Sequence, residues 1–398
     1  MILLEVIFWT AAAFIVWTHL GYPMFVALLA RLRPRPVRRA PIEPAVTLVI
    51  AAHDEQDTIE ATVRGMLALD YPPERLSIIV ASDGSTDRTD AIVSGLQAQT
   101  GGRVSLLRCP RAGKVSAQDR AVRASGESGA TGTAEAAEAA GSDIIAFSDA
   151  NAMWEQDALR RLVANFADPD VAYACGNLRL RRADGTNREG VYWRYELWVR
   201  DNESRIGSIT AGNGGIYAVR RSDYLESPDG RAGHDLGLVY RLVQRGRRAV
   251  SDPSAVAWET PARDLEDEYE RKVRMSARCW QHVVSGRMLR GGGPLFLLQI
   301  VSHRLLRYES GVLHVLLLAL AAVLTAASGA HVLYGVMLGL QLAWLALAAA
   351  GRLRLPVPGA GIAYYYLLVT WATLAGLWRY LRVGVPVTWE QAEGTRAA

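Results

Sequence analysis

Cysteine and lysine are both scarce in this sequence of 398 residues. The three cysteines, Cys109, Cys175 and Cys279, are too few for a disulfide-stapled scaffold, so we expect reduced thiols in a cytosol-facing domain. Only Lys114 and Lys272 are lysines among the 44 basic residues. The sequence has no zinc-finger spacing and no RNA-binding signature, which argues against a nucleic-acid partner. The net charge of +4 is better explained by membrane flanks and an anionic substrate.

Half of the residues are apolar and the mean hydropathy is +0.08, which is high for a soluble protein and low for a pure membrane bundle. Residues 1–30 form an apolar run that is long enough to cross a bilayer. Five arginines follow in the basic linker 31–44, and an arginine excess marks the cytoplasmic side. We expect an N-terminal transmembrane helix with the next domain in the cytoplasm; the alternative is a buried core helix.

Three more apolar runs, at 312–327, 331–350 and 362–377, predict transmembrane helices within residues 310–380. Residues 266–309 mix apolar and basic side chains, a pattern typical of amphipathic helices in the membrane interface. Arginines follow both the second and the third run, and a single crossing cannot place both groups in the cytoplasm. Either one run is re-entrant or interfacial, or the tail of residues 381–398 breaks the positive-inside rule.

Residues 45–265 have the pattern of one α/β domain. Short apolar runs at 46–52, 76–82, 104–108 and 144–148 alternate with helical periodicity, which predicts a parallel sheet. The first run leads into AAHDEQDT, without the glycines of a dinucleotide-binding turn, and there is no Walker A motif. Residues 124–142 are of low complexity and are interpreted as a mobile surface loop.

Acidic residues follow three of these runs. Residues 53–55 (His-Asp-Glu) follow the first run, Asp83 follows the second, and Asp149 follows the fourth. Because ligands of open parallel sheets bind beyond the carboxyl ends of the strands, these acids predict a nucleotide and Mg²⁺ or Mn²⁺. Any one acid alone is as readily a helix cap or an Asx turn. Lys114 is a candidate phosphate contact, with a solvated loop lysine as the alternative.

Taken in order, these segments resemble the membrane-bound family-2 glycosyltransferases, which include cellulose, hyaluronan and poly-N-acetylglucosamine synthases. The resemblance covers nearly the whole chain. The segments that carry it are VIAAHDEQDTI (49–59), VASDGSTDRT (80–89), GKVSAQDRAV (113–122), IIAFSDANAMW (144–154), GNGGIYAVRR (212–221), GHDLGLVYRLVQRGRRAVSDPSAVAWE (233–259) and YERKVRMSARCWQ (269–281). It implies a Rossmann-like GT-A domain flanked by transmembrane helices, a UDP-sugar donor, a divalent metal and inversion at the anomeric carbon.

The resemblance also implies roles for the strand-end acids. Glu55 and Asp83 resemble the acids that hold the uridine of the donor. Asp149 resembles the first aspartate of the D-x-D motif and is the expected metal ligand. The third position of that motif is Asn151, which weakens the expected metal site and is equally suited to cap the next helix.

Asp235 resembles the general base of the family, which takes the proton from the acceptor hydroxyl. His234 stands where the family has an acid, and the alternative for Asp235 is to cap a helix over residues 236–245. Gly214 lies in the segment expected to form the acceptor-side loop; the alternative is an ordinary turn into a strand.

The strict Q-x-x-R-W motif of the processive synthases is absent. Arg271, Arg274 and Arg278 share one face of a helix expected over residues 266–290. Arg278 is expected to clamp the leaving diphosphate, and Trp280 to stack on an acceptor sugar. The arginines also suit anionic lipid headgroups, and both roles are compatible.

The resemblance therefore implies an inverting, metal-dependent glycosyltransferase on the cytoplasmic face of the inner membrane. Its acceptor is a glycan or a lipid-linked acceptor, with a processive synthase and a non-processive enzyme acting on a polyprenyl phosphate as alternatives. A homo-oligomer or an export partner would complete a polymer channel. A catalytically inactive, nucleotide-binding membrane scaffold is the alternative from another class, against which Asp83, Asp149 and Asp235 argue.

Overall fold

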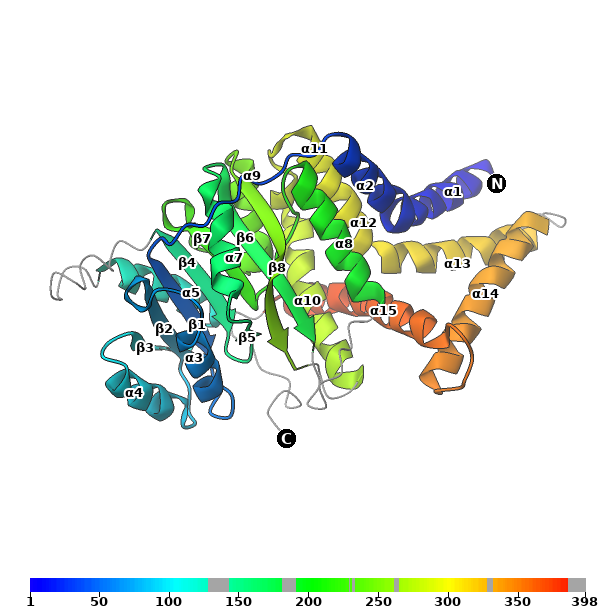
Figure 1. Cartoon of the computed structure of the whole chain (residues 1–398). Coiled ribbons are helices and arrows are strands. Elements are labelled where there is room, and N and C mark those ends of the chain that lie inside the picture. The colour runs from blue at the N-terminus through cyan, green and yellow to red at the C-terminus, as the bar shows by residue number, and fades with distance from the viewer. Residues whose placement is uncertain are drawn as a thin grey trace. The chain divides into compact units, whose positions relative to one another are not determined.

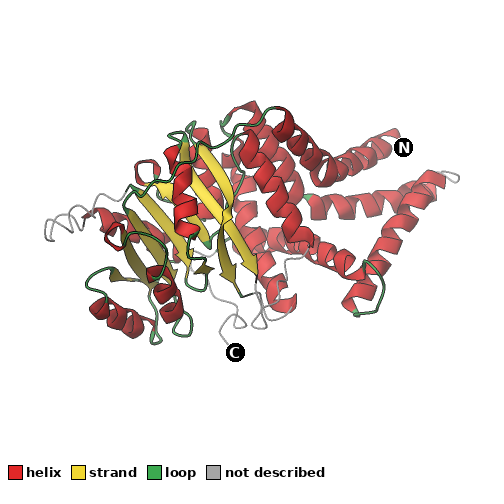
Figure 2. Cartoon of the chain, viewed as in Figure 1, coloured by secondary structure: helices red, strands yellow, loops and turns green. Residues whose placement is uncertain are grey.

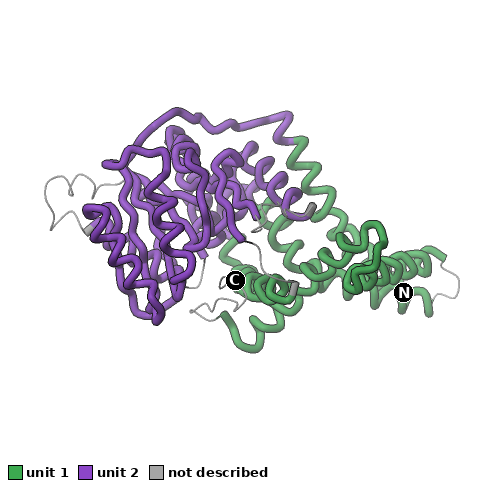
Figure 3. The backbone as a smooth tube through the Cα atoms, turned by 60° about the horizontal axis from the view of Figure 1, so that its bottom comes forward, with its two compact units in different colours: residues 1–28, 264–289, 297–385 green, residues 29–263, 290–296, 386–398 purple. Residues whose placement is uncertain are grey.

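The computed structural model describes residues 1–127, 143–180, 191–228, 230, 233–260, 265–327 and 332–385. The chain divides into two compact units (Figure 3). The helical unit comprises residues 1–28, 264–289 and 297–385, and the α/β unit comprises residues 29–263, 290–296 and 386–398. Among the described residues, all strands fall within the α/β unit, where they form one sheet of eight strands (Figure 2).

Four parallel strands form one half of this sheet (Figure 1). They are β1 (Val46–Ala52), β2 (Leu76–Asp83), β3 (Val104–Cys109) and β4 (Ile144–Asp149), in the spatial order β3-β2-β1-β4. The helices between them are α3 (Ile59–Leu67), α4 (Thr89–Gln99) and α5 (Lys114–Glu127). All of β1 is buried, as expected for a central strand with both faces covered. The α/β class and the four predicted strands are confirmed.

The other half of the sheet departs from the predicted parallel arrangement. β7 (Ile216–Arg220) runs antiparallel to β4 and to β6 (Val171–Leu180). β8 (Arg248–Glu259) is parallel to β6, and β5 (Met153–Trp154) is antiparallel to β8. The prediction was wrong here because β7 begins after a turn that lies beside the carboxyl end of β4, so the chain has to run back along β4.

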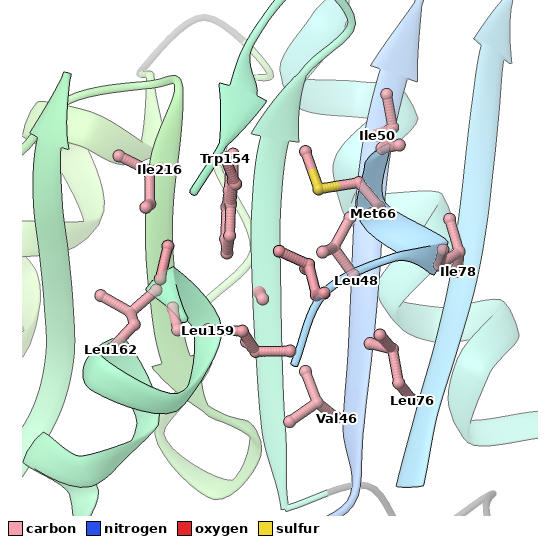
Figure 4. Packing of buried hydrophobic residues seen from close by; sticks show 14 of the residues in the cluster. Val46, Leu48, Ile50, Met66, Leu76, Ile78, Trp154, Leu159, Leu162 and Ile216 are labelled. Atoms are coloured by element: carbon pink, nitrogen blue, oxygen red, sulfur yellow. The ribbon is translucent and has the colours of Figure 1, made fainter. Parts of the chain in front are cut away.

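An apolar core of the α/β unit lies between the sheet and the helices on one of its faces (Figure 4). Leu48, Ile50 and Ile78 from the parallel strands contribute to it, together with Met66 of α3 and Leu162 of α7 (Ala158–Ala164). Each fully buried side chain of this size stabilises the fold by about 1.5–3 kcal/mol relative to an exposed one. The core therefore fixes the strands whose ends carry the predicted site.

Shorter elements complete the α/β unit. They are η2 (Pro73–Arg75), η4 (Asn165–Ala167), α8 (Val191–Ile206), η5 (Arg221–Asp223), η6 (His234–Leu238) and α9 (Val239–Gln244). The predicted helix over 236–245 is thus a π-helical turn followed by a short α-helix. The loop interpretation of residues 124–142 is wrong for 124–127, which continue α5, and residues 128–142 lie outside the described part.

The basic linker is folded onto the α/β unit. Its arginines form ion pairs with aspartates of that unit: Arg35 with Asp170 at 2.8 Å, Arg38 with Asp168 at 3.1 Å, and Arg39 with Asp252 at 3.4 Å. Burial alone would raise the pKa of Asp168, but hydrogen bonds from the backbone and side chain of Arg38 outweigh it and lower that pKa. These arginines therefore stabilise the domain as well as marking a side of the membrane.

The helices outside the sheet region begin with α1 (Ile2–Val16), the π-helical turn η1 (Trp17–Gly21) and α2 (Tyr22–Leu32). They continue with α10 (Leu265–Ser285), η7 (Arg287–Leu289), α11 (Gly293–Gln299), η8 (Ile300–Leu305), α12 (Leu306–Tyr308), α13 (Ser310–Ala327), α14 (Val332–Arg352) and α15 (Ala360–Val383). Among the described residues, four helical stretches are long and apolar enough to cross a membrane. These are the stretch Ile2–Leu32 and the helices α13, α14 and α15.

Two polar residues of η8, Ser302 and His303, are buried. The Trp17 indole nitrogen donates to the Ser302 hydroxyl at 2.8 Å, and the ring of Tyr22 lies 5.8 Å from that of His303. The N-terminal helix therefore packs against this segment, and the expectation of interface helices over residues 266–309 stays a prediction. Residues 386–398, most of the predicted tail, lie outside the described residues.

Candidate active site

The carboxyl ends of β1, β2 and β4 meet at one edge of the sheet. The register pairs Ala52 with Ser82 and Ala51 with Asp149, so the residues that follow these strands emerge side by side. Asp83 and Asp149 are the last residues of their strands. The predicted convergence of the strand-end acids is therefore confirmed, while their individual roles stay predictions.

Asp83 holds the segment that starts α5. Its carboxylate is 1% exposed and accepts hydrogen bonds from the backbone amides of Ala112 at 2.7 Å and Gly113 at 2.9 Å. The guanidinium of Arg111 lies 3.4 Å away. Gly113 has a φ of +91°, a conformation that other residues rarely adopt. The carboxylate thus fixes the backbone immediately before Lys114, and a contact with uridine stays a prediction.

Residues after β1 are tied to the loop after β2. Asp54 has a φ of +53°, and its Oδ1 accepts a hydrogen bond from the Thr86 amide at 2.7 Å. Partial burial raises its pKa, but the bonds from Thr86 and the nearby His53 outweigh burial, so the pKa of Asp54 is lowered. The Glu55 carboxylate accepts from the Thr58 hydroxyl at 2.9 Å, near the start of α3. The sequence placed Asp54 among the strand-end acids, but it did not indicate the positive φ or the lowered pKa of this residue.

Three predicted site residues from three different segments come together at Asp149. The Lys114 ammonium forms an ion pair with the Asp149 carboxylate, and both side chains are about a quarter exposed. A Cβ on Gly214 would lie 3.3 Å from Lys114 Nζ and 3.5 Å from Asp149 Oδ2. The backbone of Gly214 therefore lies directly beside this ion pair, and an added Cβ would contact both of its members. The structure thus brings the expected phosphate contact and the expected metal ligand together, while the two roles stay predictions.

Glu259, the last residue of β8, is a functional candidate that the sequence analysis missed. Its Oε1 accepts a hydrogen bond from the Asn151 side-chain amide at 3.1 Å. Asn151 stands where D-x-D has its second aspartate, so a distant strand supplies a carboxylate beside the position that lacks one. The only local signal is an acid at the end of a strand, which is uninformative without the strand pairing.

This donor set fits a divalent cation. Among the described residues, no three acidic, histidine or cysteine side chains form a preformed metal cage. Mg²⁺ and similar hard cations in nucleotide-binding enzymes typically use one or two carboxylates, with phosphate oxygens and water completing the shell. Asp149 and Glu259 flank Asn151, and all three offer oxygen ligands. In this structure the Asp149 carboxylate is ion-paired with the Lys114 ammonium.

Asp235 is joined to the same glycine segment. It lies in the π-helical turn η6, and its backbone carbonyl accepts a hydrogen bond from the Gly212 amide at 2.7 Å. Its side chain is half-buried, and a Cβ on Gly233 would come 2.4 Å from Asp235 Oδ1. The segment Gly212–Gly215 therefore connects the expected base to Asp149. π-Helical turns are rare and are frequent at functional sites.

His234, next to Asp235, is buried in a polar network on α5. Its Nε2 lies 3.2 Å from Asp119 Oδ1, and its Nδ1 lies 3.1 Å from Gln118 Oε1. The Tyr224 hydroxyl donates to Asp119 Oδ1 at 2.5 Å. Burial and the neighbouring Asp119 raise the pKa of Tyr224 far above its ordinary range, so it stays a neutral donor. The residue that replaces the usual family acid therefore anchors the turn that carries Asp235.

Arg278 and Trp280 lie on α10, in the helical unit. Trp280 is 6% exposed and its indole nitrogen donates to the Thr373 carbonyl at 2.9 Å. This packing occupies the ring, so stacking on an acceptor sugar is not carried forward for Trp280. Arg278 is half-buried, and its contact with a diphosphate stays a prediction.

The solved structure of a mannosyltransferase from Pyrobaculum calidifontis, in complex with GDP-Man and Mn²⁺, has a similar fold. The TM-score is 0.70 at 21% sequence identity, and the match covers 95% of this chain and 99% of that one. At this identity the likeness shows the fold alone. It confirms the GT-A class, including the mixed sheet.

Curated relatives are also glycosyltransferases. The chain is 29% identical over 258 residues to the probable glycosyltransferase YdaM of Bacillus subtilis, covering 61% of this chain and 56% of the relative. It is 29% identical over 234 residues to beta-monoglucosyldiacylglycerol synthase of Synechocystis, with coverages of 54% and 45%. It is 24% identical over 236 residues to poly-beta-1,6-N-acetyl-D-glucosamine synthase of Staphylococcus aureus, with coverages of 58% and 53%.

The chain spans about half the length of these relatives. Residues 44–277 match the family model described as "Glycosyltransferase like family 2". This match includes every strand of the sheet and the site at its edge. The chain therefore belongs to glycosyltransferase family 2.

Proposed function

We propose that this chain is an inverting, metal-dependent transferase that moves a sugar from a UDP-sugar to a lipid-linked or glycan acceptor. The observation that carries the proposal is the Gly212–Gly215 segment, which contacts Asp149 and Lys114 on one side and Asp235 on the other. A cation site, a phosphate-binding lysine and a carboxylate base are the three parts that this reaction needs.

Asp235 acts as the general base. As the acceptor oxygen forms its bond to the anomeric carbon, the carboxylate takes the hydroxyl proton. The bond from the anomeric carbon to the diphosphate oxygen breaks on the opposite face, and its electron pair leaves with the nucleoside diphosphate. Attack opposite the leaving group inverts the anomeric configuration, so an α-linked donor yields a β-linkage.

Lys114 and the acids around it stabilise the leaving group. The lysine is the first residue of α5 and is positioned by the backbone that Asp83 holds, so its ammonium is available to the diphosphate oxygens. Asp149 and Glu259, with Asn151 between them, would hold Mg²⁺ or Mn²⁺. When bound, such a cation supplies positive charge to the diphosphate.

We also propose that the chain is a multi-pass protein of the inner membrane with its α/β unit in the cytoplasm. The four apolar stretches support the crossings, and the linker arginines support the side. Because the linker is folded onto the α/β unit, the side of the linker is also the side of the active site. An oligomer or an export partner stays a prediction.

Nucleoside diphosphate release tests the proposal. The full chain in lipid nanodiscs is incubated with Mg²⁺ or Mn²⁺ and a panel of UDP- and GDP-sugars, with and without a polyprenyl phosphate acceptor. We expect release with one UDP-sugar, lost in Asp235→Asn while donor binding is kept. Asp170→Asn is the control, because it removes an exposed carboxylate that pairs with Arg35 and is not one of the proposed site residues.

Two results would contradict the proposal. Preference for a GDP-sugar would refute the UDP assignment. Donor binding without release in any acceptor condition would favour the inactive scaffold. The length of the product distinguishes the two alternatives within the proposal: long products identify a processive synthase, and a single addition identifies a non-processive enzyme.

A further inference from the structure

Helices α10 and α15 cross at very short range within the helical unit. A Cβ on Gly376 would lie 2.5 Å from Ser276 Cβ and 2.9 Å from the backbone nitrogen of Ala277. Farther along, the Trp280 indole donates to the Thr373 carbonyl. The two contacts pair Trp280 with Thr373 and Ser276 with Gly376. Residue numbers therefore fall along α10 as they rise along α15, so the helices run antiparallel.

This register brings basic residues together one turn beyond the crossing. Arg274 on α10 comes beside Arg379 on α15, and Arg271 and Arg278 flank Arg274 on the same helix face. Burial lowers the pKa of Arg274, and so do the charges of Arg379, Arg278 and Arg271. The charge of Glu270 opposes this effect. Arg274 therefore lies close enough to Arg271, Arg278 and Arg379 for their charges to act on it.

Little within the described structure neutralises this cluster. Arg271 pairs with Glu268 at 2.8 Å. Arg274, Arg278 and Arg379 take part in none of the ion pairs that the described residues form. Arginine keeps its charge at neutral pH even with a lowered pKa. Holding three such charges in close proximity is unfavourable unless an anion joins them.

The surroundings of Arg379 indicate what kind of anion would bind to this cluster. Arg379 lies near the end of α15, one of the four helices able to cross a membrane. Its neighbours Trp378 and Leu381 are 58% and 67% exposed, which is typical of side chains in contact with lipid. An anion at this place has apolar surface beside it. A lipid that carries a phosphate has both parts, whereas a soluble phosphate has only one.

We propose that Arg274, Arg278 and Arg379 form a binding site for the phosphate group of a membrane lipid. Guanidinium groups bind phosphate oxygens through paired, charge-assisted hydrogen bonds, and a headgroup phosphate lies at the depth where an apolar helix ends. The same chemistry is offered by an anionic phospholipid and by a lipid-linked acceptor. Binding of a lipid phosphate at this site does not depend on catalysis. The further assignment of that lipid as the acceptor of the sugar rests on the proposed function.

Arg382 provides a matched control. It lies on the same helix, one turn beyond Arg379, and its guanidinium stacks over the Trp378 ring at 4.0 Å. Replacing it removes the same charge from the same region without touching the crossing. Arg274→Lys is a second control, because it keeps the charge and loses the paired hydrogen bonds.

Binding is measured on the full chain in uncharged detergent micelles, with geranyl phosphate as the probe. Geraniol, inorganic phosphate, phosphatidylglycerol, phosphatidylcholine and UDP serve as comparisons. We expect Arg274→Gln and Arg379→Gln each to raise the Kd for geranyl phosphate about tenfold, Arg274→Lys to raise it less, and Arg382→Gln to change it less than twofold. Thermal unfolding of each variant shows whether it has kept its fold.

The comparison ligands separate the sources of the phosphate. Competition by phosphatidylglycerol at equal affinity supports a general headgroup site, and selectivity for geranyl phosphate supports an acceptor site. Equal affinity for inorganic phosphate, or competition by UDP, would overturn the lipid assignment. So would unchanged binding in folded Arg379→Gln, or an equal loss in Arg382→Gln. Because no sugar transfer is measured, an inactive enzyme leaves the test intact.

Discussion

Glu259 is expected to act in cation binding as the carboxylate that the altered D-x-D motif lacks. Its Oε1 is 3.1 Å from the Asn151 amide nitrogen, in the segment that also carries Asp149. A carboxylate that ligates a metal, or that orients a ligand, is commonly worth about 10- to 100-fold in metal affinity. We therefore expect Glu259→Gln to raise the Kd for Mn²⁺ by about 10- to 100-fold, or about 1.4–2.8 kcal/mol.

Asn151→Asp is the converse change. It places a second carboxylate beside Glu259 and removes a hydrogen bond to a charged acceptor, which is typically worth about 1.5–3 kcal/mol. Two charges about 4 Å apart repel by about 4 kcal/mol at an effective dielectric constant of about 20, and exposure to solvent reduces this value. Without metal we expect the variant to unfold at a lower temperature than the parent. With Mn²⁺ the difference is expected to reverse, because the added carboxylate binds the cation.

Both effects are measured without the sugar-transfer reaction. The signal of free Mn²⁺ in electron paramagnetic resonance gives the affinity, and thermal unfolding with and without Mn²⁺ gives the stability. Glu155→Gln is the matched control, since its Oε1 accepts from the indole of Trp258, the residue before Glu259. Equal Mn²⁺ affinity in Glu259→Gln and the parent would refute the role of Glu259. A metal-free Asn151→Asp protein as stable as the parent would refute the proximity argument.

Three further predictions concern the α/β unit. Asp119→Asn is expected to lower kcat about tenfold with little change in KM for the donor, because it weakens the contact that holds His234 beside the base. Steady-state kinetics would measure both constants, and a change in KM alone would contradict this expectation. Gly212→Ala is expected to lower the unfolding free energy by about 1–3 kcal/mol in denaturant titrations, because the added Cβ would lie 2.1 Å from the Tyr173 hydroxyl; full stability would contradict this. Asp168 has a lowered pKa in the folded state, so it stabilises the protein above its ordinary pKa of 3.8, and this contribution is lost as the pH falls below that value. The stability difference between the parent and Asp168→Asn should therefore be present at pH 7 and shrink below about pH 4, whereas a pH-independent difference would count against the assignment.

The parallel half of the site could be predicted because its signals are local. A run such as VTLVIAA identifies a buried strand without knowledge of its partners, and parallel strands end at the same edge. Once four such runs are found, the acids that follow them have to lie close together. The position of Lys114 at the start of a helix was harder to predict, because the composition of the sequence does not reveal the contacts between Asp83 and the backbone at Gly113.

The antiparallel half could not be predicted in the same way. Asn151 and Glu259 are separated by 108 positions, and their contact depends on how β5 pairs with β8. Trp280 shows the opposite failure. Its place in a motif suggested a sugar platform, but a neighbouring helix with a glycine at the crossing allowed close packing that buries the ring. Both cases depend on pairings between distant segments, which no short pattern encodes.

The acids at the sheet edge act in series more than as equivalent ligands. Asp83 points its carboxylate at the Ala112 and Gly113 amides, and this fixes the residue from which the Lys114 side chain departs. Lys114 in turn pairs with Asp149. A change at Asp83 would therefore reach the proposed diphosphate site through Lys114, even without any contact between Asp83 and the donor. The acid at the end of β2 thus has a structural role in this structure, whereas the proposed role of the acid at the end of β4 is to bind the cation.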